Sequence, residues 1–170
     1  MRVLRAVVFG LAVWTAPLAG QAASIVVEVS VSTTALSVAQ NTELTFGAVP
    51  VGVATTVDPQ ASVNAGEFEI HGNRNAEISI TMTLPDSLRV GANAMPISFG
   101  ANGGCHRNRI QQAQCDYFDP TTPLVVRIRN TPTPNNTYIV WMGGTVTPSP
   151  TQQPGIYRGT ITLTTAYTGN

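Results

Sequence analysis

Apolar and polar residues alternate one by one along several stretches of the chain, the first of which is residues 24–32. Every second residue of this stretch is apolar: Ile25, Val27, Val29 and Val31. The other face carries Val26, Glu28, Ser30 and Ser32. A period of two residues is typical of a β-strand with one buried and one solvated face. The pattern returns at residues 67–70, 78–84, 124–129, 138–142 and 157–167, and a short strand is expected to begin with Leu44 and Phe46 and to end at Gly47 and Pro50. The chain is therefore expected to consist of strands.

Turn-forming residues separate these strands, among them Asp58-Pro59, Pro85-Asp86 and Asn102-Gly103-Gly104. No stretch after the first 22 residues keeps a helical period. Strands with one dry and one wet face are what two stacked antiparallel sheets require. We therefore predict an all-β, immunoglobulin-like antiparallel β-sandwich. A closed barrel is the alternative, because alternation within a strand does not indicate how many sheets the strands form.

The first 22 residues have the pattern of a secretory signal peptide. Arg2 and Arg5 form a positive start, residues 6–14 are apolar, and small residues precede the expected cleavage after Ala22. The apolar run is shorter than the roughly 20 residues that span a bilayer, so no transmembrane segment is expected in the mature chain. Cleavage leaves seven arginines against nine acids, and this balance gives no reason to expect a nucleic-acid partner.

Composition argues against most enzymes. The chain is 43% hydrophobic and 11% charged, and it contains no lysine, which excludes a Schiff-base or P-loop lysine. Two cysteines and two histidines are too few for a cysteine-rich zinc scaffold, so neither a metal site nor a cofactor is expected. Glu67 and Glu69 share the wet face of one strand, which is ordinary for a solvated sheet rather than a sign of paired catalytic acids. We therefore expect no enzymatic activity.

The two cysteines, Cys105 and Cys115, enclose a short segment. In an oxidising compartment such a pair is expected to form a disulfide. The segment also carries His106, Arg107 and Arg109, three groups that can bind a carboxylate, a sulfate or an acidic sugar. A solvated loop that merely tolerates charge is the simpler interpretation, because loops carry such residues routinely.

The alternating strand at residues 24–32 can serve in two ways. It can be the first strand of its own domain, or it can leave that domain and complete the sheet of a neighbouring molecule by β-strand addition. Burial of its four apolar side chains in a neighbour would contribute on the order of 6–12 kcal/mol before ordering costs are subtracted. This is enough to link molecules without a covalent bond.

Three motifs carry a family resemblance. Leu44-Thr45-Phe46-Gly47 follows the first apolar strand, Gly66–Gly72 precedes the strand that ends at Pro85, and Gly155–Gly159 leads into the last strand. In order and spacing they resemble a family of secreted fimbrial-like β-sandwich domains, related to chaperone–usher pilin subunits and spore-coat-U-like proteins. The resemblance covers nearly the whole chain after residue 22.

The resemblance implies an incomplete, pilin-type sandwich that is completed by a donor strand. Residues 23–38 would be the N-terminal donor extension, with Ile25, Val27, Val29 and Val31 as its donor side chains. Residues 39–170 would be the domain. An acceptor groove would be lined from the closing strand by Gly159, Ile161, Leu163 and Tyr167.

The function implied by the resemblance is that of a structural subunit of an extracellular bacterial fimbria, polymerised by donor-strand exchange. The expected partners are further copies of the chain, a periplasmic chaperone and an outer-membrane usher. The alternative is a self-complete secreted adhesin or carbohydrate-binding module. Such a module would use the loop between the cysteines, or the aromatic residues Tyr138 and Trp141 of one strand.

Overall fold

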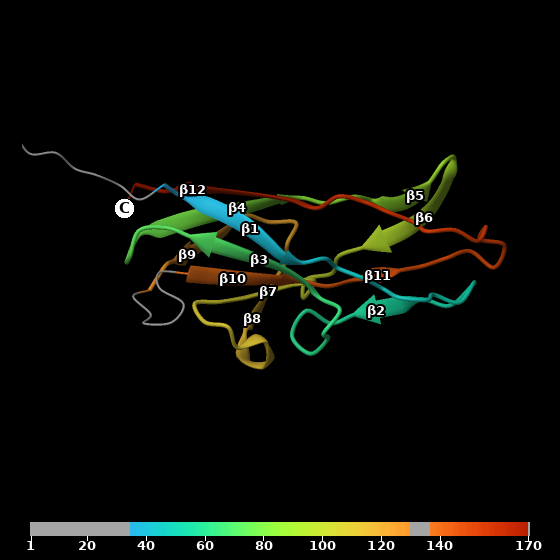
Figure 1. Cartoon of the computed structure of the whole chain (residues 1–170), viewed down its shortest axis with the longest axis horizontal. Coiled ribbons are helices and arrows are strands. Elements are labelled where there is room, and N and C mark those ends of the chain that lie inside the picture. Colours follow the sequence, from blue (N-terminus) through green and yellow to red (C-terminus); the bar gives the residue numbers. More distant parts are fainter. Residues whose placement is uncertain (1–34, 130–136, 170) are drawn as a thin grey trace, which may run out of the picture. The chain divides into compact units, whose positions relative to one another are not determined.

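The computed structural model describes residues 35–129 and 137–169, and nearly all the regular structure in these ranges is β (Figure 1). The one helical element within them is a 3-10 turn, η1 (Gln112–Gln114). The strands are β1 (Ser37–Thr42), β2 (Thr55–Val57), β3 (Gly66–His71), β4 (Glu77–Thr83), β5 (Ser87–Val90), β6 (Asn93–Ser98), β7 (Gly104–Arg107), β8 (Asp116–Phe118), β9 (Leu124–Arg127), β10 (Thr137–Met142), β11 (Gly144–Val146) and β12 (Thr162–Tyr167). No helix of the described part is long and apolar enough to cross a membrane. The expected donor residues 25, 27, 29 and 31 and the expected signal peptide lie outside the described residues.

The strands form three open sheets, and every pairing between them is antiparallel. One sheet has the order β1-β3-β10-β7-β8, the second β2-β11-β6-β5, and the third β12-β4-β9. Each sheet ends in an edge strand on both sides, so the described strands do not close into a barrel. The predicted all-β antiparallel sandwich is confirmed, and the barrel alternative is wrong.

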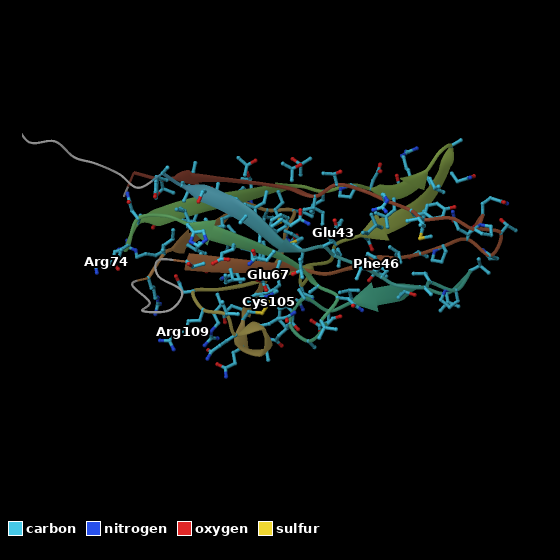
Figure 2. The ribbon with its side chains drawn as sticks, in the orientation of Figure 1. Glu43, Phe46, Glu67, Arg74, Cys105 and Arg109 are labelled. Carbon is cyan, nitrogen blue, oxygen red and sulfur yellow. A yellow bond between two sulfur atoms is a disulfide. The ribbon has the colours of Figure 1, made fainter. Side chains whose placement is uncertain are left out.

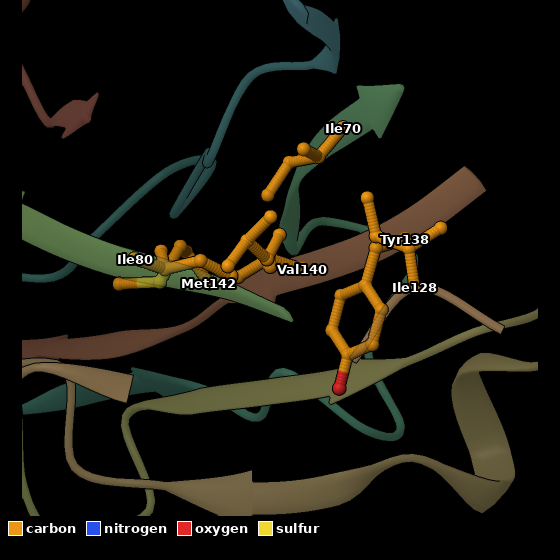
Figure 3. Close-up of a cluster of buried hydrophobic side chains, with 7 residues drawn as sticks. Ile70, Ile80, Ile128, Tyr138, Val140 and Met142 are labelled. Atoms are coloured by element: carbon orange, nitrogen blue, oxygen red, sulfur yellow. The ribbon is translucent and has the colours of Figure 1, made fainter. Parts of the chain in front are cut away.

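The main core lies between the sheet that contains β3 and β10 and the sheet that contains β4 and β9. Its seven buried side chains are Ile70, Ile78, Ile80, Ile128, Tyr138, Val140 and Met142, most of them drawn in Figure 3. Six of them come from β3, β4 and β10, at alternate positions of β4 and β10 as the period of two predicts, and Ile128 directly follows β9. Leu163 and Tyr167 of β12 and Leu36, just before β1, pack against this cluster from the edges.

A second cluster covers the opposite face of β10. Ile139 and Trp141 pack there against the Cys105–Cys115 pair, together with Val57 and Ala65. The expected disulfide is confirmed. All six residues of β10 are buried, because this strand has a hydrophobic cluster on each of its faces.

The first described strand differs from the expectation. Residues 44–46 were expected to form a strand, but the strand is β1, six residues that are all exposed and that pair with β3. Ser37 and Val38, placed by the sequence in the donor extension, belong to this strand. Main-chain pairing with β3 positions β1, whose residues are all exposed and show no alternation of buried and exposed positions.

Candidate functional site

A groove of about 970 Å3 runs between a segment near the start of the described chain and a segment near its end. One wall is residues 42–49, which continue from β1, and the other is residues 152–161, which lead into β12. Both walls continue edge strands, since β1 and β12 each have a single neighbour within the described sheets. In Figure 1 these strands, coloured blue and red, lie along the same side of the domain.

The first wall is held by its own apolar side chains. Leu44 packs against the cluster around the disulfide, and Phe46 contacts both that cluster and a third one formed by Met95, Ile97 and Val146. The backbone N–H of Thr45 donates to the carbonyl of Asn64 at 3.0 Å. The L-x-F-G motif thus anchors an extended segment against the sheet without adding a strand to it, and Glu43 and Phe46 mark this wall in Figure 2.

The second wall is tied to β5. Arg89 and Arg158 exchange two backbone hydrogen bonds, with N···O distances of 2.8 and 3.0 Å. Tyr157 packs inward on the third cluster, and its hydroxyl donates to the carbonyl of Gln153 at 2.8 Å. Further along this wall Ile161 packs on the main core. Inward and outward side chains therefore alternate along residues 155–161, as in a strand.

Gly159 occupies a position with no room for a side chain. A Cβ atom built there would lie 2.7 Å from Cδ2 of Leu88. A glycine within a strand permits a close approach, and Leu88 of the same chain is the group that approaches here. Any larger residue would have to displace Leu88, which also lines the groove.

The floor of the groove is apolar. It includes six hydrophobic side chains from five strands: Phe68, Leu88, Met95, Ile97, Met142 and Val146. Among the lining residues charge occurs only at the walls, where Glu43 is on one side and Arg158 on the other, both exposed. An extended, apolar groove between two sheet edges is suited to an additional strand, whose main chain can pair with the edges and whose alternate side chains can enter the floor.

The predicted acceptor residues are placed in two groups. Gly159 and Ile161 line the groove. Leu163 and Tyr167 lie in β12 beyond its end, packed on the main core, and the Tyr167 hydroxyl accepts the backbone N–H of Asn73 at 2.7 Å.

Much of the groove was not identified from the sequence. Phe46 was named only as part of a motif, and Leu88, Met95 and Ile97 of β5 and β6 were not singled out. Met95 and Ile97 do alternate with exposed residues, and this was the available signal. It was weak because β6 also contains a proline.

The three residues His106, Arg107 and Arg109 of the loop between the cysteines differ in their surroundings. His106 turns inward, and its Nδ1 lies 2.6 Å from the hydroxyl of Tyr138. Burial lowers the pKa of His106 below its ordinary value, against the opposing effect of Asp116. Arg107 donates to the backbone carbonyl and the side-chain oxygen of Gln114, whereas Arg109 is exposed. Two of the three groups are thus engaged by other residues of the chain.

The aromatic strand offers no free ring face. Tyr138 is 3% exposed and Trp141 is 2% exposed, and the indole Nε1 of Trp141 donates to Glu67 at 2.8 Å. The amide of Asn41 bridges Glu67 and Glu69, donating to each at 2.9 Å. These carboxylates are therefore held in a hydrogen-bonded surface network. The described residues contain no group of three or more metal-binding side chains.

No family model matches the chain, and neither a curated protein nor a solved structure matches it. The assignment of a function therefore rests on the groove.

Proposed function

We propose that the chain is a structural subunit of an extracellular bacterial filament, in which residues 24–32 of one copy occupy the groove of the next copy. The observation that carries this proposal is the open apolar groove between two sheet edges. Such a groove is the complement of a strand with one apolar face, and residues 24–32 are a strand pattern of that kind.

The dimensions of groove and segment agree. Residues 24–32 would extend for roughly 30 Å at about 3.3 Å per residue. The wall formed by residues 152–161 has ten residues, one more than this segment. Ile25, Val27, Val29 and Val31 would face the apolar floor, and the polar residues between them would face solvent. Four buried aliphatic side chains supply on the order of 6–12 kcal/mol, and each main-chain hydrogen bond adds about 1 kcal/mol net.

Insertion into a second copy is favoured over insertion into the same copy by the route of the chain. Leu36 and Tyr167 both lie against Gly72, within 3.0 Å of a Cβ built there. They close that end of the domain, whereas the groove lining begins at Gln40 and Ile161. Leu36, the second described residue, is thus outside the groove lining, and we propose that the donor strand comes from a second copy.

Export supports the same proposal. The disulfide fits an oxidising compartment, and removal of the first 22 residues as a signal peptide would free the donor segment at the new N-terminus. An unfilled apolar groove is prone to aggregation, so a periplasmic chaperone and an outer-membrane usher are proposed as partners during secretion. The product would be a fimbria at the cell surface.

The test replaces Val27 and Val29 with aspartate in the mature chain. The wild-type protein is expected to form SDS-resistant ladders that dissociate on heating, and V27D/V29D is expected to form none, because two unpaired carboxylates would enter the apolar floor. The control is Val63→Asp, since Val63 is 92% exposed and lies outside the groove lining. Ladders from V27D/V29D as abundant as those from wild type would contradict the proposal.

A mixing experiment isolates the groove from the donor. The V27D/V29D chain keeps an intact groove, so it should accept a wild-type donor strand and then end the filament. Substoichiometric V27D/V29D should therefore shorten wild-type filaments in negative-stain images, and V63D should not. Unchanged filament length would indicate that the groove does not receive the strand.

A further inference from the structure

We propose that Glu28 of the incoming strand pairs with Arg158 at the rim of the groove, and that this ion pair sets the register of insertion. This inference rests on the proposed function and adds the contact that aligns donor and acceptor. It arises from two arginines that the fold brings together and that form no ion pair with another described residue.

Arg89 and Arg158 stand directly opposite each other in an antiparallel pair. Directly opposed residues point to the same face of a sheet, and both side chains are exposed. Like charges in this position repel each other. Neither guanidinium forms an ion pair with any residue of the described part of the chain. A carboxylate on the next strand outward would relieve this repulsion.

Glu28 is the only charged residue of the segment 23–38. If the four apolar donor side chains face the floor, the period of two puts Glu28 on the outer face, the same face as Arg158. The donor strand would add beside the wall that contains Arg158, which in turn pairs with Arg89. Positive, positive and negative side chains would then form one row across three neighbouring strands.

The register that this pair defines also aligns the apolar residues. Glu28 is the midpoint of residues 25–31, and Arg158 is the midpoint of residues 155–161. With Glu28 opposite Arg158, the four donor positions face four inward positions of the wall, whichever direction the strand runs: Gly155, Tyr157, Gly159 and Ile161. Every second one of these wall positions is a glycine, beside which Val90 and Leu88 of the same domain lie.

A slip of the donor by two residues loses both features. It would bring Val26 or Ser30 opposite Arg158, and one of the four apolar side chains would pass the end of the matched wall. The acidic residue among the groove lining, Glu43, lies on the other wall and cannot take the place of Glu28 beside Arg158. The ion pair and the apolar fit therefore select the same register.

The test uses charge reversal in the full mature chain. Glu28→Arg alone and Arg158→Glu alone are each expected to reduce the rate of polymer formation by about tenfold at low ionic strength, because each opposes like charges across strands. The double variant E28R/R158E should recover to within about twofold of wild type, since the pair is restored with its polarity reversed. Arg74→Glu, an exposed arginine outside the groove, is the matched control and should assemble like wild type.

A mixture of the two single variants gives a second readout. The donor of E28R fits the groove of R158E, because both charges are reversed, and the unchanged donor of R158E fits the unchanged groove of E28R. A 1:1 mixture should therefore form alternating polymers although neither variant does so efficiently alone. The defects of the single variants should also diminish in 1 M salt, where charges are screened within about 3 Å.

The outcomes separate the two proposals. If the wild type forms polymers and the single variants assemble normally, the ion pair alone is overturned. The same holds if the single variants are defective but neither the double variant nor the mixture restores assembly. A wild-type chain that forms no polymer would overturn the proposed function and the ion pair with it. E28R alters only the segment outside the described domain, so its defect cannot be attributed to a misfolded groove.

Discussion

Replacing Cys105 and Cys115 with alanine removes the covalent link that closes the loop around η1. Alanine is the suitable replacement because the two residues are 0% and 4% exposed, and serine would leave buried hydroxyl groups. The linked cysteines are 10 residues apart. The loop-closure relation for this length gives a loss of about 2.5–3 kcal/mol in the free energy of unfolding. For a domain of this size, that corresponds to a fall in Tm of roughly 8–11 °C.

Urea unfolding of the monomeric fraction, followed by circular dichroism, measures this loss. Wild-type protein treated with a reductant is the control and should match the double alanine variant. A loss below about 1 kcal/mol would refute the reasoning. It would mean that the unfolded chain already keeps the two cysteines close together without the bond.

Two further predictions concern pH and the groove. Burial lowers the pKa of His106 below its ordinary value of 6.5, with Asp116 opposing the shift, so the unfolded chain takes up a proton before the folded chain as the pH falls. The free energy of unfolding should therefore decrease as the pH falls below about 6.5. His106→Gln should flatten this part of the pH profile of the urea midpoint. An unchanged profile would contradict the role given to His106. Gly159→Val should displace Leu88, cost about 1–3 kcal/mol and suppress polymer formation, whereas Gly100→Ala, with no atom within 4 Å of its Cβ, should do neither. Normal assembly of Gly159→Val would show that this part of the wall does not contact a donor strand.

The fold class could be predicted from the sequence because several strands have one buried face. β4 alternates strictly, with Ile78 and Ile80 at 0% and 1% exposure, and its period of two was evident. β1 could not be predicted, because all six of its residues are exposed and only main-chain pairing with β3 defines it. Strands of three or four residues, such as β2 and β8, are too short for a period to appear.

The candidate site could be predicted only in part, for a related reason. Gly159 and Ile161 lie on the wall that the closing strand continues, so the pattern of that strand located them. The floor combines side chains from strands distant in sequence, such as Phe68 of β3 and Met95 of β6. Whether these side chains come into contact depends on the order of the strands in the sheets, and the pattern within a single strand does not reveal that order.

The edge strands β2, β8 and β9 affect whether molecules can associate laterally by strand pairing. β2, β8 and β9 are three, three and four residues long, and β8 and β9 expose Asp116 and Arg127. Short borders, of which β8 and β9 also carry a charge, are poor templates for main-chain pairing with another molecule. Intermolecular pairing is thus disfavoured at these three margins, so any assembly based on strand pairing would grow in one dimension instead of spreading into a lattice.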